Sequence, residues 1–84
     1  MYALRFSMAA IKALKKAPDD VAGRIRSRLD ELAKDPFAAP GVKKLTGHPG
    51  YRLRVGDWRV LYLIEKGELV IHVVEIGQRK EVSR

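Results

Sequence analysis

The pattern of hydrophobic and polar positions changes twice along the chain, and it predicts strands at both ends with helices between them. Tyr2, Leu4 and Phe6 alternate with other residues, which is the period of two typical of a strand with one buried face. Hydrophobic residues then follow helical spacing from position 8, and the period of two returns from position 51. This order predicts an α+β domain.

Two short helices are predicted in the N-terminal half. The first covers residues 8–16, and Ser7 is its expected N-cap, because a serine hydroxyl accepts a hydrogen bond from the free amide groups at a helix start. Pro18 interrupts the pattern, and Asp19 or Asp20 is expected to cap the second helix. The second helix has an apolar stripe at helical spacing, namely Val21, Ile25, Leu29 and Leu32. Together they are expected to form an antiparallel hairpin.

A long loop at residues 35–50 is predicted after the helices, because this segment holds three prolines and three glycines. Three strands follow, at residues 51–55, 58–65 and 68–76, with two-residue turns at Gly56-Asp57 and Lys66-Gly67. Gly77 is expected to end the last strand. With the first strand they predict a largely antiparallel four-stranded sheet, in the order β-α-α-β-β-β, packed against the helical hairpin.

The two turns set the register of the strands and divide their side chains between two faces. The first turn places Arg54 opposite Arg59, and the second places Leu61 opposite His72. The apolar face is expected to cover the helices and carries Tyr51, Leu53, Val55, Trp58, Val60, Tyr62, Ile64, Leu69, Ile71 and Val73. The other face carries Arg52, Arg54, Arg59, Leu61, Leu63, Val70, His72, Val74 and Ile76. It is therefore cationic at one end and apolar at the other.

The cationic end predicts an anion-binding site. Like charges that face each other across a strand pair destabilise a sheet by up to ~1 kcal/mol, and an anion between Arg54 and Arg59 would offset that repulsion. The alternative is that both side chains extend into water, where salt screens them. Arginine binds phosphate oxygens in pairs, and Lys43, Lys44 and Arg52 flank the pair, which predicts a groove for an RNA backbone. Single-stranded RNA is favoured over duplex DNA, because neither helix carries a run of base-reading polar side chains.

Composition agrees with a polyanionic partner and excludes other classes. The 84 residues carry a formal net charge of +7, which favours nucleic acid, an anionic membrane or an acidic protein, although excess charge also keeps small proteins soluble. The absence of cysteine excludes disulfides and thiolate metal sites. No apolar stretch approaches the ~20 residues of a membrane span, and no signal peptide is visible. We therefore expect one cytoplasmic domain over residues 1–84.

Other candidate chemistry is sparse. His72 is interpreted as a structural histidine rather than a base, since the register places it toward the apolar end, and His48 is interpreted as a flexible surface residue. Trp58 and Tyr62 are interpreted as core residues. The sequence contains no glycine motif for phosphates and no metal-ligand spacing, so we expect neither a cofactor nor a metal ion.

Residues 44–62, with the sequence KLTGHPGYRLRVGDWRVLY, and the tail VVEIGQRKEVSR resemble the RelE/ParE superfamily of toxins. The element order and the chain length match as well, so the resemblance covers essentially the whole chain. It implies a RelE-like fold and the toxin of a type II toxin–antitoxin pair. RelE-type members bind the ribosomal A site and cleave mRNA there. The 2′-hydroxyl attacks the adjacent phosphate and leaves a cyclic phosphate, with no metal ion.

The resemblance also implies roles for individual residues. The family's basic strand positions correspond to Arg52, Arg54 and Arg59, and the arginine after the last strand corresponds to Arg79. The expected catalytic cations are therefore Arg54, Arg59 and Arg79. The expected RNA-binding residues are Lys43, Lys44 and Arg52.

The tail departs from the family pattern at two positions. The family's C-terminal tyrosine aligns with Ser83, a weak substitute because serine cannot stack on a base or serve as the same acid or base. Gln78 stands where the family has histidine or lysine. Arginines stay protonated and are poor general bases, so we expect cleavage that is slower than in the family, absent, or dependent on ribosomal groups. Arg79 joins the site only if Gly77 breaks the strand register.

Three functions follow from these observations. The first is a ribosome-dependent mRNA endoribonuclease (mRNA interferase) that inhibits translation. The alternatives are a ParE-type toxin that inhibits DNA gyrase without nuclease activity, and a weakened toxin that mainly binds its antitoxin. Each has an acidic antitoxin as its expected partner, partly disordered until it binds. For the endoribonuclease, the ribosome and mRNA are expected as further partners. Operator DNA is expected to bind only through the antitoxin complex, and no membrane partner is expected.

Overall fold

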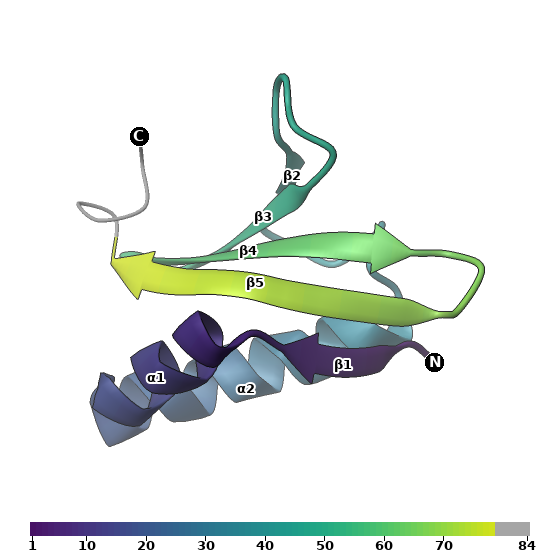
Figure 1. Cartoon of the computed structure of the whole chain (residues 1–84). Coiled ribbons are helices and arrows are strands. Elements are labelled where there is room, and N and C mark those ends of the chain that lie inside the picture. The colour runs from purple at the N-terminus through teal and green to yellow at the C-terminus, as the bar shows by residue number, and fades with distance from the viewer. Residues whose placement is uncertain (79–84) are drawn as a thin grey trace.

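The computed structural model describes residues 1–78, in which a five-stranded sheet carries two helices on one face (Figure 1). The elements are β1 (Ala3–Phe6), α1 (Met8–Lys16), α2 (Asp19–Lys34), β2 (Val42–Lys44), β3 (Tyr51–Val55), β4 (Trp58–Glu65) and β5 (Val70–Gln78). The strand order is β1-β5-β4-β3-β2, with β1 parallel to β5 and the other neighbouring pairs antiparallel. The predicted α+β class is confirmed, and the sheet has five strands where four were predicted.

The additional strand is β2, which lies inside the segment predicted to be a loop. Its three residues pair with β3, so that Lys43 lies opposite Arg52 and Lys44 opposite Tyr51. A three-residue strand is too short to show an alternating pattern in the sequence. β2 is an edge strand, and lysines at such an edge hinder its pairing with other chains.

Helix α1 begins where predicted, and its cap also holds the sheet. The Ser7 hydroxyl accepts a hydrogen bond from the Ala10 amide at 3.0 Å and donates one to the Val74 carbonyl at 2.5 Å. The Ser7 amide donates to the Val73 carbonyl at 2.9 Å. The start of α1 is therefore tied to the middle of β5.

Replacing Ser7 with alanine is expected to lower the free energy of unfolding by about 1 kcal/mol, because a helix cap and a bond to β5 are lost together. Urea unfolding followed by circular dichroism measures the change. Ser27→Ala is the matched control, since Ser27 is exposed in the middle of α2 and alanine is the better helix former there. Equal stability of Ser7→Ala and wild type would contradict the capping role.

Helix α2 differs from the prediction at its first turn. Its N-cap is Pro18, which makes no side-chain cap hydrogen bond, and Asp19 and Asp20 both lie in the first helical turn. The prediction that one of these aspartates is the cap is therefore wrong. Their negative charges still stabilise α2, because a helix N-terminus carries partial positive charge.

The core lies between the helices and the sheet. Ile25 and Leu32 of α2 are fully buried, and they belong to one cluster with buried strand residues, namely Leu53, Val60, Tyr62, Ile71 and Val73. Trp58 packs against the same cluster while staying partly exposed. The interpretation of Tyr62 as a core residue is therefore confirmed, whereas Trp58 lies at the edge of the core.

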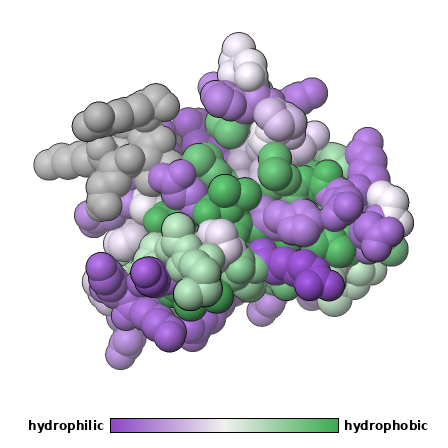
Figure 2. All heavy atoms as spheres, viewed as in Figure 1, coloured by the Kyte–Doolittle hydropathy of each residue, from purple (hydrophilic) through white to green (hydrophobic). Residues whose placement is uncertain are grey.

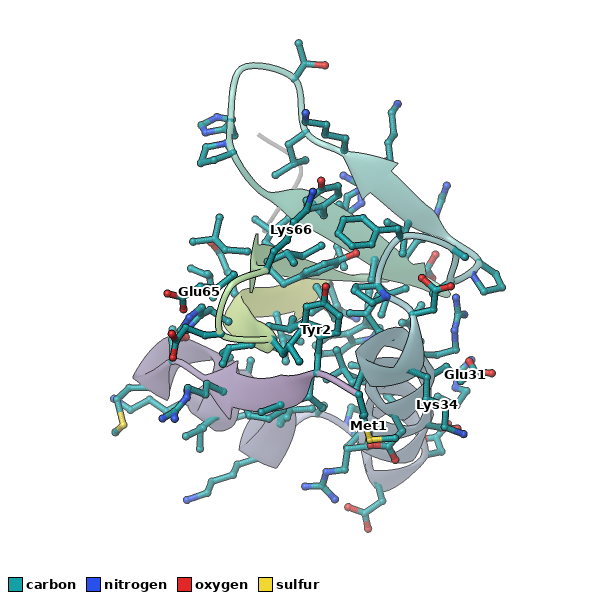
Figure 3. The ribbon with its side chains drawn as sticks, turned by 90° about the vertical axis from the view of Figure 1, so that its right-hand side faces the viewer. Met1, Tyr2, Glu31, Lys34, Glu65 and Lys66 are labelled. Carbon is teal, nitrogen blue, oxygen red and sulfur yellow. The ribbon has the colours of Figure 1, made fainter. Side chains whose placement is uncertain are left out.

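Tyr62 buries a hydroxyl group in this core. Its side chain is 1% exposed and stacks on Tyr51 with ring centroids 5.7 Å apart, and its hydroxyl has no hydrogen-bond partner among the described residues. Phe37 packs edge-on against Tyr51, and Lys66 lies over the Phe37 ring. Figure 3 faces this end of the molecule and labels Lys66. Burial, and to a lesser degree the neighbouring Tyr51, raises the pKa of Tyr62 well above its usual value.

Tyr62→Phe is expected to raise the free energy of unfolding by about 1 kcal/mol near pH 8, because it removes a buried hydroxyl without a partner. The difference in the free energy of unfolding between Tyr62→Phe and wild type is expected to grow above pH ~10. In that range the unfolded chain ionises Tyr62 while the folded chain keeps it neutral, so the free energy of unfolding of wild type falls by about 1.4 kcal/mol per pH unit. Guanidinium unfolding at about pH 8 and about pH 11 measures both effects, with half-buried Tyr2→Phe as control. A difference that stays constant with pH would contradict burial as the cause.

The hairpin of β3 and β4 has the predicted register. Gly56 in its turn adopts a φ of +59°, which glycine reaches without strain. Arg54 lies opposite Arg59, and Arg52 lies opposite Leu61. The facing arginines inferred from the sequence are therefore present.

The hairpin of β4 and β5 differs from the prediction. Its turn has four residues, 66–69, rather than two, and Leu69 adopts a φ of +54°, which is strained for leucine. As a result β5 begins at Val70, and His72 lies opposite Leu63 instead of Leu61. The strand also continues past Gly77, where the sequence predicted its end.

A β-bulge interrupts β5 and changes which residues face the core. Tyr62 pairs with Val73, whereas the preceding Leu61 pairs with Glu75, so Val74 is the extra residue. The bulge turns Ile76 toward the core, where it is 5% exposed. Its predicted place on the opposite face is therefore wrong.

Candidate functional site

The sheet face turned away from α1 and α2, here called the outer face, gathers positively charged strand residues. Pleating puts alternate residues of a strand on one face, and the strand pairing aligns them in two rows across the sheet. One row contains Lys43, Arg52, Leu61 and Glu75, and the other contains Arg54, Arg59 and Gly77. The four cations Lys43, Arg52, Arg54 and Arg59 form what we call the cationic face.

The side chains of the cationic face have different surroundings. Lys43 and Arg54 are exposed, whereas Arg52 and Arg59 are half-buried. The Nε of Arg52 is buried and has no hydrogen-bond acceptor among the described residues.

The structure separates Lys44 from the other predicted RNA-binding residues. Lys44 pairs with Tyr51, whose ring stacks on the core residue Tyr62. Strand alternation therefore places Lys44 on the helix side of the sheet, while its neighbour Lys43 joins the cationic face. Arg79 and Ser83 lie outside the described residues.

Glu75 is an outer-face residue that the sequence pattern did not indicate. Regular alternation would have put it on the helix side, because the register break was expected at Gly77. The break occurs three residues earlier, at Val74, and brings Glu75 to the outer face. The signal in the sequence is the spacing of three between Val73 and Ile76, since two core residues of one strand are separated by an even number unless a bulge intervenes.

The apolar end of the outer face holds His72. Its Nε2 lies 2.8 Å from Oε1 of Glu65, and this partner agrees with the interpretation of His72 as structural. His48 is exposed in the segment between β2 and β3. Within residues 1–78 no three His, Asp or Glu side chains are grouped as metal ligands would be, and neither described helix is long and apolar enough to cross a membrane.

A groove on the helix side is the second surface feature. It has a volume of about 430 Å³, lies between β1, α1 and α2, and is lined by apolar side chains with two cations and one acid, namely Leu4, Phe6, Ile11, Leu14, Leu29, Lys15, Arg26 and Asp30. Figure 2 shows hydrophobic side chains reaching the surface between α1 and the strands on this side. The groove therefore offers an apolar surface at the edge of the core, since Leu14 and Leu29 also belong to the core cluster.

Comparison with known proteins shows what the chain is similar to. Residues 4–83 match a family model described as ParE toxin of type II toxin-antitoxin system, parDE. The archaeal RelE–RelB complex from Pyrococcus horikoshii OT3 contains a chain with 29% identity and a TM-score of 0.82, with 93% of this chain and 94% of that chain covered. A chain of the intact E. coli RelBE toxin–antitoxin complex has 25% identity and a TM-score of 0.82, with 93% of this chain and 96% of that chain covered. A chain of the RelBE2 complex from Mycobacterium tuberculosis has 22% identity and a TM-score of 0.81, with 93% of this chain and 98% of that chain covered. At this low identity the match shows the fold alone. No curated protein matches.

Proposed function

Because the chain belongs to the ParE toxin family of type II toxin–antitoxin systems and is RelE-like in structure, we propose that it is a ribosome-dependent mRNA endoribonuclease. It binds mRNA in the ribosomal A site, cuts it there and so inhibits translation. The observation that carries this proposal is the cationic face, which presents four positive side chains from three adjacent strands.

The cationic face suits an RNA phosphodiester. Neighbouring strands lie ~4.8 Å apart, so the facing Arg54 and Arg59 can present two guanidinium groups to one phosphate. Arg52 and Lys43 lie one row away, which supports a contact with a neighbouring phosphate.

The proposed reaction develops negative charge where these cations lie. The 2′-hydroxyl oxygen attacks the adjacent phosphorus and the P–O5′ bond breaks, which leaves a 2′,3′-cyclic phosphate and a 5′-hydroxyl. Charge accumulates on the phosphate oxygens in the transition state. Cations held in place by the sheet stabilise that charge without having to reorganise.

Cleavage of mRNA on programmed ribosomes tests the proposal. The purified protein is added to ribosomes that hold a defined codon in the A site, and the mRNA ends are mapped by primer extension. A cut within that codon that leaves a cyclic phosphate supports the proposal, and mRNA that stays intact overturns it. An mRNA with a 2′-deoxynucleotide at the cut site is the matched control, because it lacks the attacking hydroxyl.

The proposed partner of the toxin is an acidic antitoxin. The E. coli and P. horikoshii relatives both occur in complexes with RelB. The net charge of +7 favours an acidic segment, and the groove between β1, α1 and α2 supplies an apolar surface for its side chains. Co-purification with the product of a short, acidic neighbouring reading frame tests this pairing. In a gel mobility assay, operator DNA is expected to bind that complex and not the toxin alone.

Inhibition of DNA gyrase is the second candidate function, because the matching family model describes ParE toxins. A supercoiling assay with purified gyrase distinguishes it from the first. Blocked supercoiling together with intact ribosomal mRNA would favour the gyrase target. A protein that does neither and still binds its antitoxin would be a weakened toxin.

A further inference from the structure

The β-bulge of β5 places a carboxylate beside the cationic face. Val73 and Ile76 are 1% and 5% exposed, whereas Val74 and Glu75 between them are exposed. Two consecutive exposed residues occur because the pairing skips Val74, so that Glu75 lies opposite Leu61. Glu75 therefore stands in the same row as Arg52 and Lys43.

The bulge is held by the start of α1. The Ser7 hydroxyl donates to the carbonyl of the extra residue, Val74, and the Ser7 amide donates to the carbonyl of Val73. The same hydroxyl accepts from Ala10 and caps α1. Bulges often occur next to active sites, where they re-aim a side chain, and here the re-aimed side chain is that of Glu75.

Glu75 lies close to the cations without an ion pair to any of them. It is the diagonal neighbour of Arg59, a Cα separation of ~7–8 Å that long side chains can bridge. No ion pair of its carboxylate forms within residues 1–78. Gly77, which lies opposite Arg59, adds no side chain between them. The carboxylate oxygens are thus available beside the place where Arg54 and Arg59 would hold a phosphate.

RNA cleavage of the proposed kind needs a group that removes the proton from the 2′-hydroxyl. Arginine stays protonated and cannot do so, and the resemblance to RelE-type toxins aligns Ser83 with the family's tyrosine. A carboxylate accepts protons and serves as a general base in many enzymes. The outer face supplies one in Glu75.

On the basis of the proposed function, we propose that the Glu75 carboxylate is the general base of RNA cleavage. It takes the proton of the 2′-hydroxyl while an electron pair of the 2′-oxygen forms the new bond to phosphorus. The P–O5′ bond breaks with its electron pair left on the 5′-oxygen, which takes a proton from water. The proton on Glu75 then passes to the resulting hydroxide, so atoms and charge balance and the carboxylate is restored.

Single-turnover cleavage on programmed ribosomes, with the toxin at saturation, tests this role through Glu75→Gln. The rate at neutral pH is expected to fall by about 10²–10⁴-fold. The wild-type rate is expected to stay flat around neutral pH, because a carboxylate rather than hydroxide removes the proton. The Glu75→Gln rate rises about tenfold per pH unit, because hydroxide must then remove the proton. Glu75→Asp, which keeps a shorter carboxylate, retains the flat profile at a reduced rate.

Glu68→Gln is the matched control, since it makes the same change at an exposed position in the turn 66–69. It is expected to match wild type in rate and pH profile, and thermal unfolding confirms that each variant is folded. A Glu75→Gln variant that cleaves as fast as wild type, or more slowly with a flat profile, overturns the role of Glu75 and leaves the proposed function standing. Wild-type protein that does not cleave mRNA overturns the proposed function and this role together.

Discussion

Replacing both Arg54 and Arg59 with alanine is expected to slow mRNA cleavage on ribosomes by at least ~10³-fold. The two residues face each other across β3 and β4, so under the proposed function both would act on one phosphate. Loss of a single preorganised donor at such a site typically lowers the rate by about 10²–10³-fold. The reduction in the cleavage rate of the double variant is expected to be smaller than the product of the reductions in the two single variants, because the residues act as a unit. Single-turnover primer extension measures all three variants.

The matched control removes the same charge from the opposite side of the molecule. Lys12 and Lys16 are exposed on α1, and the Lys12→Ala/Lys16→Ala variant is expected to cleave within about threefold of wild type, since exposed charges far from a site are screened. Circular dichroism shows whether each variant is folded. A folded Arg54→Ala/Arg59→Ala variant that cleaves within tenfold (~1.4 kcal/mol) of wild type would exclude these arginines from the chemistry.

The register that brings these arginines together follows from local residues and could be predicted. Gly56 supplies the positive φ of the turn, and regular alternation on both sides of it leaves one register that keeps the hydrophobic residues on one face. The bounds of α1 were equally accessible, because Ser7 is an N-cap whose partner is only three residues away. Turns and caps of this kind depend on neighbours in sequence.

The remaining part of the outer face depends on contacts between distant residues. The turn before β5 contains Leu69 at a positive φ, a conformation that is usual for glycine. Because leucine does not indicate such a conformation, the four-residue turn could not be predicted from the residue type. The bulge at Val74 is held by Ser7, 67 residues earlier. The side of the sheet on which Glu75 lies is therefore a tertiary effect, and alternation alone put it with the core.

The same reasoning applies to the two lysines of β2. They are adjacent in sequence and both lay in a predicted loop, where neither has a defined direction. Pairing of β2 with β3 puts Lys43 opposite Arg52 and Lys44 opposite Tyr51, and pleating then sends them to opposite faces. If this segment is interpreted as a loop, the directions of the two lysine side chains cannot be told apart, whereas a three-residue strand assigns each of them to one face of the sheet.

The sheet can hold its cations in place only while α2 stays packed beneath it, and this leads to the largest expected change in stability. Ile25 is 0% exposed at the centre of α2, and Ile25→Ala is expected to lower the free energy of unfolding by about 2–5 kcal/mol through lost burial and the cavity left behind. A domain of this size has roughly 4–13 kcal/mol in total. The change therefore lowers the ratio of folded to unfolded protein roughly 30- to 5000-fold.

Urea unfolding of Ile25→Ala beside Ile11→Ala separates core packing from the loss of any hydrophobic side chain. Ile11 is 36% exposed on α1, so the same truncation there is expected to change the free energy of unfolding by less than ~1 kcal/mol. The slope of the unfolding curve is expected to stay the same for both, because neither substitution changes how much surface unfolding exposes. Equal losses for the two variants would mean that α2 is not packed against the sheet as described. The outer face would then lack the rigid support that preorganised cations require.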